Sequence, residues 1–224
     1  MVPQVFAVRT GEKYGPHYED YINSKIPNVT WIREEIIAPK QWNKLVPMSY
    51  DIDEPIVVID IDQMFVNDYM DAINYPIERG EFLSARSWWG DTHKKEYTIQ
   101  GGFQKYYPKD VKYIYDEFVS RPEYWMNYYV ENKTTIPGMG EQYFVEDMVR
   151  KNLTIKYLPS SWVTRWEHQM SHRLTLGLNL DYSLDWLYLG EKFHPQVRLV
   201  HFLDQESLDK EGLEVLIQSE PFSD

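Results

Sequence analysis

The chain has 224 residues, of which 43% are hydrophobic and 26% charged, a composition typical of a folded protein with one substantial core. Its 35 acidic residues outnumber the 23 Lys and Arg residues, and the resulting net charge of −12 disfavours nucleic acid and anionic membrane surfaces as partners. Cysteine is absent, which excludes disulfides, thiolate metal sites and a cysteine nucleophile.

No apolar run approaches the roughly 20 residues of a membrane-spanning helix. The N-terminal segment also lacks the basic region and the long apolar region of a signal peptide. We therefore expect a soluble, cytoplasmic protein in which residues 1–224 form a single domain, either alone or as part of a longer polypeptide.

Strand-like and helix-like segments alternate in the first part of the chain. Gln4–Arg9 predicts a strand that runs into a Thr-Gly turn, and the apolar residues of Tyr18–Ile26 have helical spacing that Pro27 stops. Val29–Ile37 is a weaker strand candidate. The continuous β-branched run Ile56–Ile59 predicts a strand that is buried on both faces.

The same alternation continues to the end of the chain, although residues 166–192 show no clear pattern. A helix is predicted over Met64–Ile73, another from Pro108, a third after Gly140 and a last one from Ser207; strands are predicted at Phe82–Arg86, Tyr97–Ile99, Ile155–Leu158 and Val197–Val200. Strands that alternate with helices predict an α/β sandwich with a mainly parallel sheet.

The strongest chemical signal is the sequence Asp60-Ile-Asp62, which directly follows the buried strand Ile56–Ile59. Residues two apart in a strand point the same way, so we expect both carboxylates on one side, at the edge where α/β sheets bind ligands. Two close carboxylates repel unless a cation lies between them, and Mn²⁺ or Mg²⁺ prefers such oxygen ligands. The alternative is a solvated turn, because Asp-x-Asp is a common triplet.

His201 follows another strand-like run, Val197–Val200, near the end of the chain. If that strand is parallel to the one before Asp60, His201 reaches the same edge as Asp62, and imidazole is a common ligand of Mn²⁺-like ions. Alternatively, His201 only packs at the end of its strand.

Several segments together resemble the glycosyltransferases of the GT-A fold, and within them the group of glycogenin and bacterial galactosyltransferases. Phe6–Tyr14 resembles the first strand and Thr-x-x-x-Tyr turn of that group, and Asp60–Asp62 resembles its metal-binding Asp-x-Asp. Ile99–Phe103 resembles its Asn-Ser-Gly segment, Gly140–Gln142 its Asp-Gln element, and Val200–Phe202 the segment with its late His. The chain also resembles glycosyltransferase domains encoded by large viruses of green algae. If it has such an origin, we expect it in the cytoplasm of the host.

The resemblance implies a GT-A sandwich, a UDP-sugar donor, a Mn²⁺ or Mg²⁺ cofactor, and a glycan or protein-linked acceptor. It also implies a role for individual residues, to which we add Arg86 because it follows a predicted strand at the ligand edge. The expected roles are metal binding for Asp60, Asp62 and His201; nucleotide binding for Thr10, Tyr14, Asp60 and Arg86; sugar binding for Gln100, Gly101 and Gly102; and catalysis for Gln142 and Glu141.

The chain departs from the pattern of this group at two of these elements. Gln100-Gly101 stands where the group has Asn-Ser, and Glu141 stands where it has Asp. The resemblance implies transfer with retention of configuration, which needs no protein base. Inverting enzymes of the wider fold use an acidic base, for which Glu141, Asp147 and Asp91 are candidates.

Two other functions remain open from the sequence. Haloacid-dehalogenase-like phosphatases also use a strand-borne Asp-x-Asp, with the first Asp as nucleophile, but they place Thr or Val where this chain has Met64 and carry the motif closer to the N-terminus. A sugar-binding module without catalysis is the third candidate.

Overall fold

The computed structural model describes residues 2–87, 97–134, 140–165 and 196–201. The predicted helix from Ser207, the segment 166–192 and the candidate base Asp91 lie outside the described residues. No helix in the described part of the chain has the length and apolarity needed to cross a membrane.

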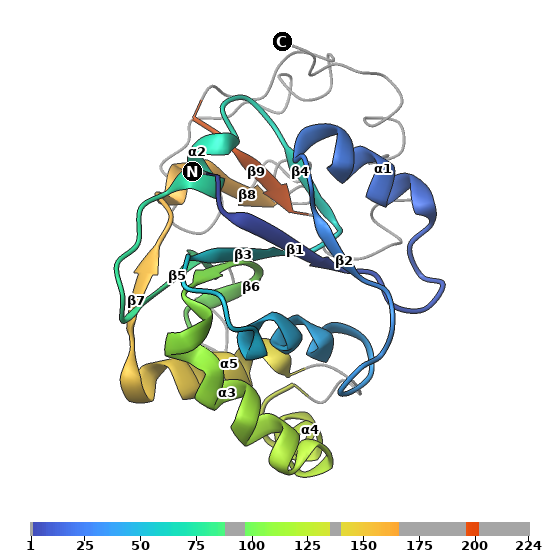
Figure 1. Ribbon diagram of the computed structural model, residues 1–224, viewed down its shortest axis with the longest axis vertical. Coiled ribbons are helices and arrows are strands. Elements are labelled where there is room, and N and C mark those ends of the chain that lie inside the picture. The colour runs from blue at the N-terminus through green and yellow to red at the C-terminus, as the bar shows by residue number, and fades with distance from the viewer. Residues whose placement is uncertain (1, 88–96, 135–139, 166–195, 202–224) are drawn as a thin grey trace.

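A six-stranded sheet forms the middle layer of the molecule (Figure 1). Its strands follow one another in the order β2-β1-β3-β6-β5-β7, and all run in the same direction except β6, which is antiparallel to both of its neighbours. The strands are β1 (Gln4–Val8), β2 (Thr30–Ile32), β3 (Ile56–Ile59), β5 (Glu81–Arg86), β6 (Ile99–Tyr106) and β7 (Thr154–Tyr157). The prediction of an α/β sandwich with a mainly parallel sheet is therefore confirmed.

Helices cover both faces of this sheet (Figure 1). The helix α1 (Pro16–Lys25) lies on one face, and α3 (Pro108–Ser120), α4 (Pro122–Tyr129) and α5 (Glu141–Asn152) lie on the other. Proline occupies the first turn of α1, α3 and α4, where its missing N–H removes no helical hydrogen bond. The other helical segments of the described residues are α2 (Met70–Asn74), the 3₁₀ segments Lys40–Ser49 and Ser160–Trp162, and the π-helical turn Val130–Thr134.

Alternating side chains of the central strands enter two different cores. Val57 and Ile59 of β3 pack with α1, whereas Val58 packs with α3 and α5 on the opposite face. All three side chains are fully buried. This explains why β3 has a continuous apolar sequence, since a strand with helices on both faces has no solvent-facing side.

A second, three-stranded sheet packs on the α1 side of the molecule. It has the order β4-β9-β8, from β4 (Gln63–Phe65), β8 (Val163–Arg165) and β9 (Leu199–His201). The sequence predicted a helix over Met64–Ile73, but the first part of that segment is β4 and only Met70–Asn74 is helical. The β4 strand forms because β9, from far along the chain, supplies its hydrogen-bonding partner.

The strand predicted at Tyr97–Ile99 starts at Ile99 and continues through both glycines to Tyr106. Because β6 runs against β3, its first residues lie beside the last residues of β3, as the pairing of Ile59 with Phe103 shows. The pairing of β5 with β6 shifts between Ser84 and Ala85, so that Ala85 lies opposite Gln100 while Ser84 lies opposite Gln104. The antiparallel direction of β6 brings its start to the edge where β3 ends.

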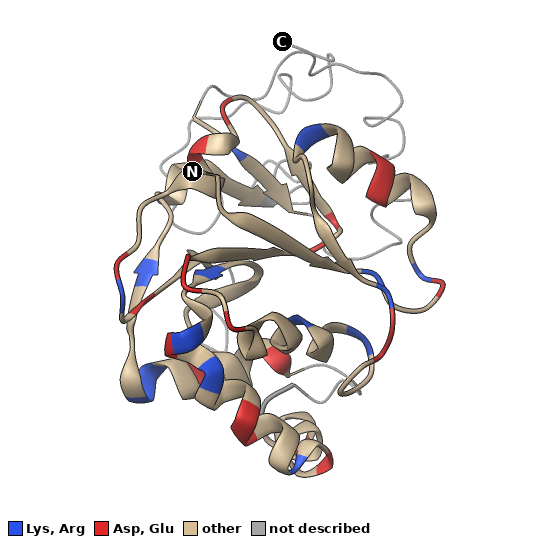
Figure 2. Ribbon diagram, viewed as in Figure 1, with Lys and Arg blue, Asp and Glu red and all other residues tan. Residues whose placement is uncertain are grey.

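Charged side chains of both signs share the surface helices; α3, for example, carries Lys109, Asp110, Lys112 and Asp116 (Figure 2). Several of these charges are paired, as Lys112 is with Asp116 one turn along α3. Exposed pairs of this kind contribute little to stability.

Candidate metal and sugar-donor site

Asp60 and Asp62 lie in the turn that follows β3, at the carboxyl edge of the main sheet. The strand ends at Ile59, so the two carboxylates converge in a turn instead of along the strand as the sequence predicted. The backbone N–H of Asp60 donates to the carbonyl oxygen of Gly102 at 2.9 Å, which fixes the start of this turn against β6.

His201 reaches these carboxylates from the second sheet. It is the last residue of β9 and lies opposite Gln63 in an antiparallel pair, whereas the sequence argument assumed a parallel strand. Gln63 is the residue directly after Asp62, so the β4–β9 pairing carries the imidazole to the Asp-x-Asp turn. Asp60, Asp62 and His201 each offer one ligand atom, and these three atoms lie within 4.8 Å of one another.

These three donors suit a hard divalent cation. Two carboxylates and one imidazole are typical ligands for a Mn²⁺-like ion. Burial raises the pKa of Asp62, and the nearby Asp60 carboxylate raises it further, while His201 and Lys44 oppose this rise. A cation in this position would relieve the repulsion between the carboxylates of Asp60 and Asp62.

Tyr14 closes one side of this group. Its hydroxyl donates to Oδ2 of Asp62 at 3.2 Å, and its ring lies edge-on to Tyr18 of α1. Burial raises the pKa of Tyr14, as does the neighbouring Asp62 carboxylate, so its hydroxyl stays protonated and acts as a donor. Arg9 holds the same loop by donating to the carbonyl oxygen of Tyr14 at 3.1 Å.

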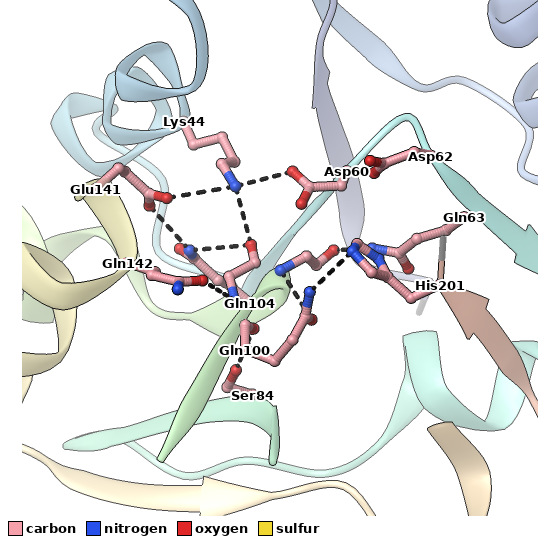
Figure 3. A network of polar contacts seen from close by, with 12 residues as sticks. Lys44, Asp60, Asp62, Gln63, Ser84, Gln100, Gln104, Glu141, Gln142 and His201 are labelled. Atoms are coloured by element: carbon pink, nitrogen blue, oxygen red, sulfur yellow. Dashed lines mark hydrogen bonds and ion pairs between the residues drawn. The ribbon is translucent and has the colours of Figure 1, made fainter. Parts of the chain in front are cut away.

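A buried lysine joins the two acidic parts of the site (Figure 3). Nζ of Lys44, from the 3₁₀ segment Lys40–Ser49, lies 2.8 Å from Oδ1 of Asp60 and 3.3 Å from Oε2 of Glu141. It also donates to the carbonyl oxygen of Gly101 at 3.1 Å. Burial by itself lowers the pKa of Lys44, but the carboxylates of Asp60 and Glu141 outweigh it and hold that pKa above its ordinary value.

The first residues of α5 contact β6. Oε1 of Glu141 accepts from Gln104 at 3.1 Å, and Oε1 of Gln142 accepts from the backbone N–H of Gly101 at 3.3 Å. A Cβ atom on Gly101 would lie 3.1 Å from Cβ of Gln142, which explains the absence of a side chain there. Both expected catalytic residues therefore lie beside the expected sugar-binding segment.

Gln100 and Gln63 enclose Gly102 from two sides. The backbone N–H of Gly102 donates to Oε1 of Gln100 at 2.9 Å, and its carbonyl oxygen accepts from Nε2 of Gln63. A Cβ atom on Gly102 would come within 2.6 Å of Gln63 and 2.7 Å of Gln100, so a side chain here would displace both glutamine amides. Nε2 of Gln100 lies 3.3 Å from Nε2 of His201.

Two of the expected nucleotide-binding residues lie away from these contacts. Thr10 is partly buried in the turn after β1. Arg86, at the end of β5, is exposed, and its guanidinium lies over the ring of Tyr157, 4.6 Å from the ring centroid. The stacking turns Arg86 toward β7, so its role in nucleotide binding stays a prediction.

Three residues of this site were not predicted from the sequence: Lys44, Gln63 and Gln104. A signal for Lys44 was present, because a lone lysine between Trp42 and Leu45 in an apolar segment indicates a buried charge with a partner. The even spacing of Gln100, Gly102 and Gln104 is typical of a strand, and it indicates that β6 continues past Ile99. Nothing near Gln63 in the sequence reveals its pairing with His201.

No protein-family model matches this sequence, and no curated protein matches it either. Solved structures do match. The glycosyltransferase GlyE of Streptococcus pneumoniae TIGR4 superimposes with a TM-score of 0.59 at 12% identity, over 100% of this chain and 61% of GlyE. The present chain thus spans less than two thirds of GlyE.

Two further glycosyltransferases have similar structures. One, involved in glycosylation of the major capsid of PBCV-1, matches with a TM-score of 0.54 at 12% identity, over 93% of this chain and 98% of its own. The galactosyltransferase LgtC, solved with donor and acceptor sugar analogues, matches with a TM-score of 0.51 at 8% identity, over 89% of this chain and 86% of its own. The fold of this protein is therefore the GT-A fold of these glycosyltransferases.

Proposed function

We propose that this protein is a metal-dependent glycosyltransferase that uses a UDP-sugar donor. The observation that carries the proposal is the group of Asp60, Asp62 and His201, whose ligand atoms lie within 4.8 Å of one another at the carboxyl edge of the sheet. That edge is where open α/β sheets bind ligands. When bound there, Mn²⁺ or Mg²⁺ supplies positive charge that stabilises a leaving diphosphate.

The side chains around this group divide into a nucleotide side and a sugar side. On the nucleotide side we place Thr10, Tyr14 and Arg86, with Asp60 shared between the metal and the ribose. On the sugar side, Gln100, Gly101 and Gly102 present backbone at the start of β6. The resemblance of Ile99–Phe103 to the Asn-Ser-Gly segment of glycogenin-like enzymes supports this assignment, and the close contacts of Gly101 and Gly102 with neighbouring side chains explain why glycine stands at these positions.

We place Glu141 and Gln142 beside the reacting centre and propose transfer with retention of configuration. Glu141 is 2% exposed, and both of its oxygens are engaged, one by Lys44 and one by Gln104. Asp147, the other described candidate base, accepts hydrogen bonds from the hydroxyls of Tyr97 and Tyr129 at 3.0 and 2.6 Å. These contacts leave neither carboxylate well placed to take a proton from an acceptor hydroxyl.

The acceptor, on this proposal, is a glycan or a protein-linked sugar, and the protein acts in the cytoplasm as one domain over residues 1–224. Resemblance to glycogenin-like enzymes supports the donor and the stereochemistry. The likeness to the viral capsid-glycosylating enzyme supports glycosyl transfer as the class of reaction.

Thermal melting tests the proposal most directly. UDP and Mn²⁺ together should raise Tm by several degrees, whereas either alone should change it little, because the ligand stabilises only the native state and needs the ion. His201→Ala should remove most of this shift while the unliganded Tm stays close to that of the wild type. His17 is an exposed histidine of α1. The variant His17→Ala is therefore the matched control and should keep the full shift in Tm.

The opposite outcomes are equally clear. No extra stabilisation from the pair of ligands would contradict the proposal. Hydrolysis of an aryl phosphate that Asp60→Asn abolishes would instead identify a phosphatase, and binding of oligosaccharide without metal or nucleotide would identify a sugar-binding module. Release of UDP from a panel of UDP-sugars in the presence of Mn²⁺ would then identify the donor.

A further inference from the structure

The amide group of Gln100 is held in one orientation. Its Oε1 accepts the backbone N–H of Gly102 at 2.9 Å, so the carbonyl side of the amide faces the main chain and the NH₂ side faces away from it. The main chain of Gln100 is fixed as well, because the buried hydroxyl of Ser84 donates to its carbonyl oxygen at 2.8 Å. The side chain itself is only 4% exposed.

This orientation points Nε2 of Gln100 at His201, where it lies 3.3 Å from Nε2 of the imidazole (Figure 3). An amide NH₂ group can only donate, so the imidazole nitrogen that faces it must carry a lone pair and no proton. That unprotonated nitrogen is also the form in which histidine binds a metal ion. The amide thus favours the ring tautomer that can bind a metal ion through this nitrogen.

We propose that Gln100 is a positioning residue for the metal ligand His201. In the metal-free protein its N–H holds Nε2 of the imidazole beside Asp60 and Asp62, and it gives way when a divalent cation takes the same lone pair. At 3.3 Å the hydrogen bond is long, so its displacement costs little compared with the gain from a ring that is already in place. The inference rests on the proposed metal-dependent function and deepens it.

This role differs from the one implied by the resemblance to glycogenin-like enzymes. In those enzymes, the Asn at the position of Gln100 belongs to a segment next to the donor sugar. The longer Gln100 of this chain reaches past Gly102 to His201, and the bare Cα of Gly102 is what lets it do so.

The test is the affinity for Mn²⁺ alone, measured without nucleotide by the electron paramagnetic resonance signal of the free ion. Gln100→Met keeps the length of the side chain and removes the N–H, and we expect about tenfold weaker Mn²⁺ binding, the size typical of lost support for a metal ligand. Gln4→Met is the matched control. It removes a glutamine of β1 that donates to Oγ1 of Thr30, and it should leave Mn²⁺ affinity unchanged.

A second measurement needs no variant and stays valid if Gln100→Met fails to fold. Nitrogen-15 NMR of histidine-labelled, metal-free protein reports which imidazole nitrogen is protonated, and the spectrum of His201→Ala identifies the signal of His201. We expect Nε2 unprotonated and the proton on Nδ1. A protonated Nε2 in the neutral ring would overturn the inference.

The outcomes separate this inference from the proposed function. If wild-type protein binds Mn²⁺ and Gln100→Met binds it equally well or more tightly, the positioning role is wrong and the proposed function stands. If the wild type does not bind Mn²⁺ even with UDP present, the metal-dependent function fails and the positioning role fails with it.

Discussion

At the scale of single residues, Lys44 supplies the positive charge between two acidic side chains of the site. Its ammonium group is the described cation that contacts both Asp60 and Glu141, and its side chain is only 5% exposed. A buried ion pair is costly to break because the partner that remains keeps its charge without compensation. Glu141, at 2% exposure, is the partner that would lose most.

Lys44→Met should therefore lower the free energy of unfolding at pH 7 by about 3 kcal/mol. Adding Glu141→Gln to that variant should recover part of the loss, since the amide carries no charge to strand in the interior. Urea unfolding of the two single variants and the double variant measures the coupling. A loss below about 1 kcal/mol for Lys44→Met would show that solvent reaches the pair and that the pair contributes little.

At the scale of elements, the antiparallel direction of β6 determines which residues meet. A parallel strand in this place would bring Tyr106 to the ligand edge. The reversed strand brings Gln100 and the two glycines there instead. It places Lys105 near the opposite end of β6, away from the site. Lys105 is 3% exposed and donates to the carbonyl oxygens of Ile73 and Tyr75, at 2.8 and 2.7 Å, where α2 ends.

Burial lowers the pKa of Lys105 from 10.5 to about 8. Between these two pH values the unfolded chain keeps the proton that the folded protein has lost, so the folded state gains stability as pH rises. Relative to Lys105→Met, the wild type should become more stable by about 2 kcal/mol between pH 7 and pH 10. Chemical unfolding of both proteins at several pH values measures this difference, and a difference that stays constant or falls with pH would contradict it.

At the scale of the whole molecule, the described residues form two sheets that meet at the candidate metal site. Asp60 and Asp62 follow β3 of the six-stranded sheet, and His201 ends β9 of the three-stranded sheet. The backbone N–H of Val66 donates to the carbonyl oxygen of Arg198 at 3.0 Å and continues the β4–β9 pairing beyond β4. A cation held by all three ligands would link the two sheets directly.

Binding of Mn²⁺ should therefore slow backbone hydrogen exchange in β4 and β9, because opening of the small sheet would require loss of a metal ligand. We expect clear protection of residues 63–66 and 199–201 and little change in α3, which lies on the opposite face of the main sheet. Hydrogen exchange with mass spectrometry, with Mg²⁺ and Mn²⁺ compared, measures this effect. Protection confined to other segments would show that the ion binds elsewhere.

Much of the fold was predictable from local pattern. The β-branched run Ile56–Ile59 predicts a doubly buried strand, and the proline at Pro108 predicts the start of α3, because these features depend on neighbours in the sequence. The meeting of Asp60, Asp62 and His201 in one candidate metal site was predictable, since each residue follows a recognisable strand. Whether residues 1–224 are one domain, and how Arg86 acts, stay predictions.

The sequence alone determined the alternation of strands and helices, the position of the Asp-x-Asp turn and the absence of thiol chemistry, since these depend only on residue type and spacing. The tertiary structure decided the direction of β6, the existence of the second sheet and the partners of Lys44 and Gln100. Those features depend on contacts between segments far apart in the chain, as between Gln100 and His201, and hydrogen bonds across such distances leave no periodic trace in the sequence.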